Sequence, residues 1–188
     1  MTTKTDNLTL EEFWALPPGE TAFELVDGRA ILKVSPKSFH SFLQGALDRL
    51  IHPWCRGLGR VGPEWAVFLK RNGRDWVPTP DVTYVSYARL PQGFRPEARN
   101  EACPIPCDLA IEIISPDQSQ GELTQKAQDY LKAGVLRVWV IDPETVDITV
   151  FFPDGTRALY TGDTKIIDTL LPGLELSPQL IFEEAELL

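Results

Sequence analysis

The stretch that most constrains the fold of this chain covers residues 108–142. It begins with a short apolar run, Leu109–Ile114, turns at Ser115 and Pro116, and continues in a helical pattern that ends at Gly134. The apolar segment LRVWVID follows directly. Two apolar strands joined by a helix form a β-α-β unit, whose strands pair in parallel. The stretch therefore predicts an α/β fold with a parallel strand pair in its sheet.

One acidic residue, Glu112, stands in the middle of the first apolar run. Strand alternation places its side chain on the same face as those of Ala110 and Ile114. A carboxylate buried in such a strand is destabilising by several kcal/mol unless it is paired, protonated or bound to a metal. A structural ion pair with Arg137 is one explanation, and a catalytic or metal-binding role is the other.

A second carboxylate of interest is Asp81, which follows Pro80 at the head of the predicted strand VTYV. Aspartate is common at turns and strand starts, so Asp81 alone indicates no function. If this strand lies beside the strand of Glu112, however, the two carboxylates converge. A divalent cation between them would then offset their repulsion.

Lys126 lies in the predicted helix that follows Glu112. On a helical wheel it stands next to Tyr130, at the edge of the apolar face, and Tyr130 is expected to be core with its hydroxyl at the edge of the site. Lysines in such positions often only extend past apolar surface into solvent. Next to two carboxylates, an ammonium can instead orient an attacking water and offset charge in a phosphoryl-transfer transition state.

The rest of the chain predicts a mixed sheet flanked by helices, and we expect residues 1–188 to form one domain. Capping boxes, helical periodicity, strand alternation and turn dipeptides indicate the elements. These are a short helix LEEFWAL after Thr9, a hairpin around Asp27 and Gly28, a helix from Ser35 and Pro36 to about Pro53, strands at Glu64–Lys70 and Val77–Val85, a long loop over Tyr87–Cys107, a hairpin around Pro153–Gly155 and a small C-terminal helix.

Composition restricts the location and the partners. The 188 residues are 43% hydrophobic, yet no segment approaches the roughly 18 apolar residues of a membrane helix and none resembles a signal peptide. We therefore expect a cytoplasmic protein without a membrane partner. Cys55, Cys103 and Cys107 lack the further ligands of a zinc site and are predicted to be reduced thiols. The net charge of −9 disfavours, without excluding, a nucleic-acid partner, because phosphates bind basic surfaces.

Three segments together, TPDVTYVS, LAIEIISP and ELTQKAQDYLKAGVLRVWVIDPE, resemble the Uma-type group of restriction endonucleases in the PD-(D/E)XK nuclease superfamily. FELVDGRAILKVSP with His40 and LPGLELSP extend the resemblance over nearly the whole chain. The resemblance implies a restriction-endonuclease-like fold with an N-terminal helix and hairpin. It also implies Mg²⁺-dependent cleavage of nucleic acid, foremost DNA, with Mn²⁺ as an alternative ion.

The resemblance further implies roles for individual residues. Asp81 and Glu112 match the motif acids and, with the carbonyl of Ile113, would hold the metal. The strand position of the usual lysine is Ile114, and Lys126 stands where this group carries the lysine on the following helix. Four other residues are candidates for accessory roles, although ordinary structural roles explain the first two equally well or better: Glu24, His40, Glu122 and Tyr130.

Two departures keep other functions open. Ser119 stands where the group has an arginine, and Glu122 stands where it has an aspartate. A nucleic-acid- or protein-binding module that keeps the fold without turnover is one rival, favoured by the net charge and the altered motif. A metal-dependent hydrolase of smaller phosphate esters is another. For a nuclease that cuts two strands, a homodimer would supply the two active sites.

Overall fold

The structure, a computed structural model, describes residues 6–16, 23–32, 38–95, 102–116 and 118–188. Six strands form a mixed sheet in the order β10-β9-β8-β7-β6-β3, in which β7 and β8 are parallel and all other neighbours are antiparallel. The strands are β3 (Gly59–Pro63), β6 (Val82–Ser86), β7 (Leu109–Ile113), β8 (Arg137–Asp142), β9 (Asp147–Phe151) and β10 (Arg157–Thr161).

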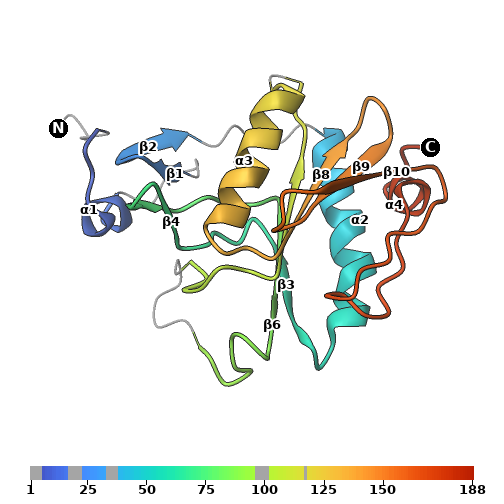
Figure 1. Ribbon diagram of the computed structural model, residues 1–188, viewed down its shortest axis with the longest axis horizontal. Helices are drawn as coiled ribbons and strands as arrows, with labels where there is room; N and C mark the ends of the chain where they lie inside the picture. Colours follow the sequence, from blue (N-terminus) through green and yellow to red (C-terminus); the bar gives the residue numbers. More distant parts are fainter. Residues whose placement is uncertain (1–5, 17–22, 33–37, 96–101, 117) are drawn as a thin grey trace.

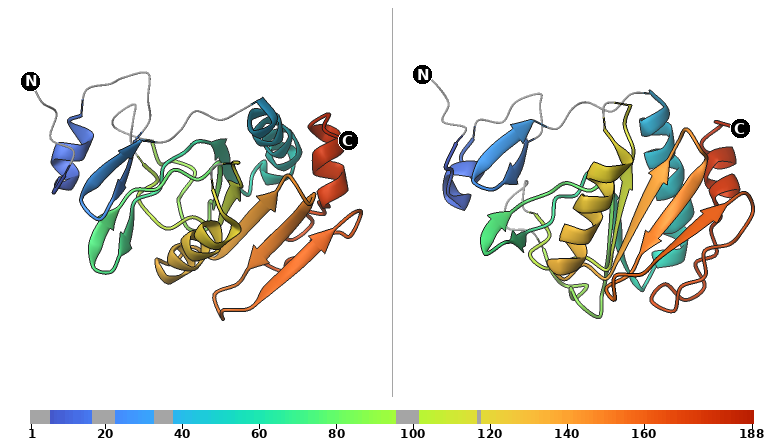
Figure 2. Two further views of the ribbon diagram at one scale, coloured as in Figure 1. Left: turned by 90° about the horizontal axis from the view of Figure 1, so that it is seen from above. Right: turned by 45° about the horizontal axis from the view of Figure 1, so that its top comes forward.

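Helices cover both faces of this sheet. The long helix α2 (Ser38–Cys55) and the short helix α4 (Pro178–Glu184) pack on one face, and α3 (Gln120–Lys132) packs on the other (Figures 1 and 2). The structure therefore confirms the predicted mixed sheet flanked by helices. It also confirms the β-α-β unit, because α3 connects the parallel strands β7 and β8.

Strand β7 lies in the interior of the sheet and is buried on both faces. Leu109, Ile111 and Ile113 belong to the core shared with α2 and α4, and Ala110 belongs to the core shared with α3. Alternation along the strand therefore turns Glu112 toward α3, as the apolar pattern predicts. This orientation brings the acid to the helix that carries Lys126.

The N-terminal elements lie beside α3, at the opposite side of the molecule from the C-terminal helix (Figure 1). Positive φ angles at Asp27 (51°) and Gly28 (78°) make the tight turn between the strands β1 and β2, which confirms the predicted hairpin. A second small hairpin, β4 and β5, packs next to it. The elements of this region are α1 (Leu10–Trp14), β1 (Phe23–Val26), β2 (Arg29–Leu32), β4 (Leu69–Arg71) and β5 (Arg74–Trp76).

Two predicted strands are wrong in extent. The segment Glu64–Lys70 is no single strand, because Glu64 adopts a positive φ of 52° that ends the pairing of β3, and β4 begins only at Leu69. The segment Val77–Val85 is interrupted, because Pro78 and Pro80 have no N–H to donate to a neighbouring strand. Only β6, from Val82 onward, joins the central sheet.

The predicted helix start at Ser35 and the predicted loop over Tyr87–Cys107 include residues that the structure does not describe. The predicted helix start at Ser35 and Pro36 lies outside the described residues, and α2 is described from Ser38. In the described parts of the predicted loop, 87–95 and 102–107, there is no helix and no strand beyond a single bridge between Cys103 and Val67.

Candidate active site

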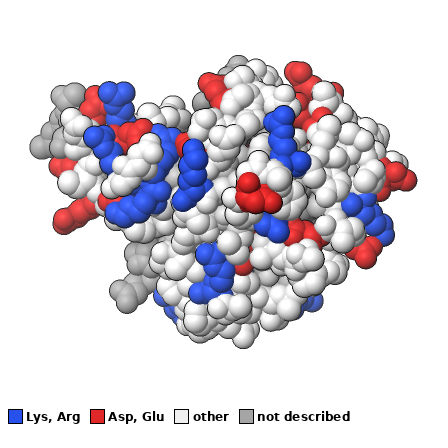
Figure 3. Space-filling view, in the orientation of Figure 1, with Lys and Arg blue, Asp and Glu red and all other residues white. Residues whose placement is uncertain are grey.

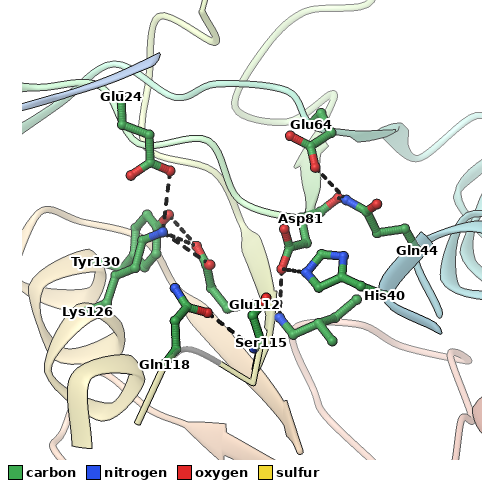
Figure 4. A network of polar contacts seen from close by, with 11 residues as sticks. Glu24, His40, Gln44, Glu64, Asp81, Glu112, Ser115, Gln118, Lys126 and Tyr130 are labelled. Atoms are coloured by element: carbon green, nitrogen blue, oxygen red, sulfur yellow. Dashed lines mark hydrogen bonds and ion pairs between the residues drawn. The ribbon is translucent and has the colours of Figure 1, made fainter. Parts of the chain in front are cut away.

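The structure brings Asp81 and Glu112 to neighbouring strands at the same end of the sheet (Figure 4). Val82 pairs with Ile111, and continuation of this register by one residue sets Asp81 opposite Glu112. Asp81 Oδ2 accepts a hydrogen bond from the backbone N–H of Ile113 at 2.7 Å. Only 3% of Asp81 and 4% of Glu112 are exposed. Both carboxylates are therefore buried at the same end of the sheet, where the negative charge of Asp81 acts on Glu112.

Lys126 reaches this pair from the middle of α3. Its Nζ lies 3.0 Å from Glu112 Oε1 and 3.4 Å from Glu24 Oε1. The hydroxyl of Tyr130, one turn further along the helix, donates to Glu112 Oε1 at 2.7 Å. With 23% of its side chain exposed, the lysine lies at the boundary between the core and the solvent. The helix therefore supplies an ammonium and a hydroxyl to the same carboxylate.

Helix α2 supports the other carboxylate. His40 Nε2, in the first turn of α2, lies 3.2 Å from Asp81 Oδ2. Gln44, four residues later, donates from Nε2 to the Asp81 carbonyl at 3.2 Å and to Glu64 Oε1 at 2.7 Å. Residues four apart share one helix face, so this spacing could have identified Gln44 from the sequence once His40 was chosen. No local pattern distinguishes Glu64.

The electrostatic setting of Glu112 follows from these neighbours. Burial raises its pKa from the ordinary value of 4.5 to about 7, and the negative charges of Asp81 and Glu24 act in the same direction. Together they outweigh the opposite influence of Lys126 and of the hydrogen bond from Tyr130. Near neutral pH the protonated and the ionised form of Glu112 are therefore both populated.

The two helix residues keep their protons. Burial disfavours the charged form of Lys126, but the nearby carboxylates of Glu112 and Glu24 outweigh it and raise the lysine pKa above its ordinary value. Burial, followed by the charges of Glu112 and Glu24, raises the pKa of Tyr130 well above its ordinary value. Lys126 is therefore a permanent cation, and Tyr130 is a permanent hydrogen-bond donor.

Arg137 and Glu122, which are candidates for the site on sequence grounds, bind residues outside it. Arg137 forms its ion pair with Asp168, with Nη2 3.1 Å from Oδ1, so the predicted alternative of a Glu112–Arg137 pair is wrong. Glu122 is exposed and forms the capping box at the start of α3, where its Oε2 accepts from the N–H of Ser119 at 2.8 Å. That contact explains Glu122 as a residue that stabilises the helix start.

The donor set of the site suits a hard divalent cation. It comprises the carboxylates of Asp81 and Glu112, and the backbone carbonyl of Ile113, whose N–H bonds to Asp81, is the third candidate ligand. Within the described ranges, no group of three or more His, Cys, Asp or Glu side chains could hold a metal ion. Mg²⁺ usually keeps several waters and takes only one or two protein carboxylates, so two acids and a carbonyl fit it or Mn²⁺. The surplus of buried negative charge around Glu112 favours such an ion as well.

Removal of the Tyr130 hydroxyl tests how strongly Glu112 is held. We expect Tyr130→Phe to lower the free energy of unfolding by about 1–3 kcal/mol, because a buried acceptor loses its donor. Urea unfolding of the two proteins measures this difference. Tyr160→Phe, on the edge strand β10, is the matched control and should change stability little. Equal stability of Tyr130→Phe and wild type would show that the hydrogen bond contributes nothing.

The arrangement of sheet and helices is that of restriction-endonuclease-like nucleases. The sequence model of the family described as "Uma2: Putative restriction endonuclease" matches residues 10–179, and the chain belongs to this family. The chain is also similar to a solved structure from Anabaena variabilis ATCC 29413, described as "a putative nuclease belonging to DUF820". The two share 28% sequence identity and a TM-score of 0.77 over 95% of this chain and 99% of the other.

The comparison with curated proteins gives no significant match. Among the helices of the described part of the chain, none combines the length and the apolar character needed to cross a lipid bilayer.

Proposed function

We propose that this protein is a metal-dependent nuclease that hydrolyses phosphodiester bonds in DNA. The observation that carries the proposal is the convergence of Asp81, Glu112 and Lys126, which come from the start of β6, from β7 and from α3. Membership of a family of restriction-endonuclease type and the likeness to a nuclease structure support it. Fold alone would not, because one fold can support many functions.

In the proposed mechanism Asp81, Glu112 and the Ile113 carbonyl would hold Mg²⁺, or Mn²⁺ in its place. A divalent ion bound there would supply Lewis-acid chemistry, making a water more acidic and offsetting negative charge on the phosphate. Because metal ligands must be deprotonated, a proton would compete with the ion for Glu112, whose pKa burial raises to about 7. His40 and Ile113 N–H fix the orientation of the Asp81 carboxylate.

Side chains of the protein would position the attacking water and stabilise the charge that develops on the phosphate. The Lys126 ammonium, a permanent cation 3.0 Å from Glu112, can orient the attacking water and offset charge as it develops on the phosphate oxygens. Tyr130, from the same helix as Lys126, donates a hydrogen bond to Glu112 Oε1 and so helps to orient its carboxylate. The buried walls around Asp81 and Glu112 exclude bulk water, which strengthens these interactions.

The charge distribution bears on the substrate. Although the net charge is −9, Figure 3 shows Lys and Arg side chains over the β1–β2 and β4 region, with Asp and Glu side chains among them. Three of these cations form ion pairs, Arg29 with Asp6, Lys70 with Asp75 and Arg71 with Asp27, so a phosphate backbone that bound here would compete with these carboxylates. The rival function, a binding module without turnover, is favoured by the same net charge and by Ser119, which stands where the resembling group carries an arginine.

Cleavage assays test the proposal directly. Purified protein is incubated with Mg²⁺ or Mn²⁺ and with linear, supercoiled or single-stranded DNA. We expect metal-dependent cleavage by wild type and a loss of about a hundredfold or more in Asp81→Asn, because the metal contributes several kcal/mol to the transition state. Mn²⁺ affinity, measured by calorimetry, should fall at least about tenfold in the same variant.

The outcomes separate the candidate functions. Wild type that binds DNA and Mn²⁺ but cuts no DNA, with Asp81→Asn indistinguishable from it, would contradict the nuclease and favour the binding module. Hydrolysis of a small phosphodiester without any cleavage of DNA would favour a hydrolase of smaller esters. Glu175→Gln removes a carboxylate from an exposed ion pair with Lys165 and serves as the matched control for charge.

A further inference from the structure

We infer that Glu24 is a positioning residue that holds Lys126 in place, so that the N-terminal hairpin forms part of the active site; this inference deepens the proposed nuclease function and rests on it. Glu24 belongs to β1, and its side chain is only 14% exposed. The sequence alone leaves both an accessory and an ordinary structural role open for Glu24. The contacts indicate a positioning role.

A single oxygen of Glu24 joins two parts of the site. Glu24 Oε1 accepts a hydrogen bond from the backbone N–H of Thr79 at 2.9 Å and lies 3.4 Å from Lys126 Nζ. Thr79 precedes Asp81 by two residues. Glu24 therefore connects the segment that leads into the motif aspartate with the helix that carries the lysine (Figure 4).

The geometry gives Lys126 two anionic partners with different tasks. Glu112, at 3.0 Å, is also a proposed metal ligand, so its interaction with the ammonium changes when it binds an ion. Glu24 approaches the ammonium from another direction than Glu112 and is anchored by Thr79. The ammonium therefore keeps one fixed partner throughout the reaction. Such preorganisation matters because small displacements of a catalytic group reduce rates strongly.

The hairpin that carries Glu24 is itself firmly attached. Leu25 and Val77 exchange backbone hydrogen bonds of 3.2 and 2.9 Å, and both side chains are buried. At the turn of the hairpin, Asp27 pairs with Arg71, whose Nη1 lies 3.5 Å from Asp129 Oδ2 in α3. The hairpin is thus joined both to the segment before Asp81 and to α3, the two elements that Glu24 connects.

The variant Glu24→Gln tests this role because the amide oxygen can still accept from Thr79 while the charge that holds Lys126 is lost. We expect kcat for DNA cleavage at saturating Mn²⁺ to fall about ten- to a hundredfold, with KM for DNA unchanged. A residue with a purely structural role would leave kcat unchanged under conditions in which both proteins are fully folded. Glu175→Gln, which neutralises the partner of Lys165, is the matched control and should retain full activity.

A double-mutant cycle shows whether Glu24 acts through Lys126. In a Lys126→Met background, Glu24→Gln is expected to lower kcat no further, because the group that it positions is already absent. Two effects that simply multiply in the double variant would overturn the inference.

A measurement independent of catalysis separates failure of this inference from failure of the proposed function. Acylation of lysine amines, followed by mass spectrometry, reports how firmly each ammonium is held. We expect Lys126 to be modified several-fold faster in Glu24→Gln than in wild type, relative to Lys165 as an internal reference. Faster modification in a protein that cuts no DNA would uphold the positioning role and refute the nuclease. Unchanged modification of Lys126 would overturn the inference whether or not the protein cuts DNA.

Discussion

A Lys126→Met variant is expected to cleave DNA about a thousandfold more slowly than wild type. The ammonium of Lys126 lies 3.0 Å from Glu112, at the point where charge would develop on a bound phosphate. Methionine preserves the length and the apolar contacts of the side chain but can neither orient a water nor offset that charge. Single-turnover cleavage rates with saturating Mg²⁺ measure the loss directly.

The Lys126→Met substitution should not weaken Mn²⁺ binding, although it slows cleavage. Loss of the Lys126 ammonium leaves the carboxylates of Asp81, Glu112 and Glu24 without their compensating positive charge. The Mn²⁺ affinity of the variant should therefore be at least as high as that of wild type. This comparison requires about pH 9, because loss of Lys126 raises the pKa of Glu112 further. Lys132→Met, at the exposed last turn of the same helix, is the matched control and should cleave normally. Normal cleavage by Lys126→Met would exclude Lys126 from the mechanism.

The metal-free protein is expected to lose about 3 kcal/mol of stability relative to its Glu112→Gln variant as the pH rises from about 4.5 to about 7. Burial, with the charges of Asp81 and Glu24, raises the folded-state pKa of Glu112 from 4.5 to about 7. Between these values the folded state binds more protons than the unfolded state, so the stability falls as the pH rises. Above about pH 7 both states are ionised and the difference levels off.

Urea unfolding in the presence of a chelator, at several pH values, measures this dependence. Parallel stability curves for wild type and Glu112→Gln would contradict it. The control is Glu122→Gln, because the pKa of the exposed Glu122 is lowered by hydrogen bonds from Ser119. A lowered pKa contributes stability that is present at higher pH and lost on acidification, so this control should give a difference of opposite sign. Added Mn²⁺ should stabilise wild type at high pH, because the ion binds only the folded protein.

The elements around Glu112 were predictable because their signals are local. The apolar run of β7, the capping box at Ser119 and the break at Gly134 lie within one short stretch, and each acts through neighbouring residues. The position of Lys126 beside Tyr130 follows from helical geometry in the same way. The β-α-β unit and its mixed sheet could therefore be derived before any tertiary contact was known.

The errors arose where distant residues decide the structure. The strand predicted over Val77–Val85 has an apolar pattern, but its first half pairs with β1 at Leu25 instead of joining the central sheet. Arg137 was a reasonable partner for Glu112 by chain proximity, yet strand alternation turns it to the other face, where Asp168 lies. From the sequence an ordinary structural role explains His40, because no local pattern connects it with Asp81, which lies 3.2 Å from its Nε2 in the structure.

The sequence by itself determined the α/β class, the β-α-β unit at Glu112 and the three residues from which a site could be built. Only the tertiary structure decided that β6 lies antiparallel to β7, so that Asp81 stands opposite Glu112. It also decided that Glu24, 102 residues before Lys126 in the chain, holds the lysine. The physical reason is that helices and turns form from interactions between near neighbours. Strand order and buried charge contacts depend instead on which distant segments pack together.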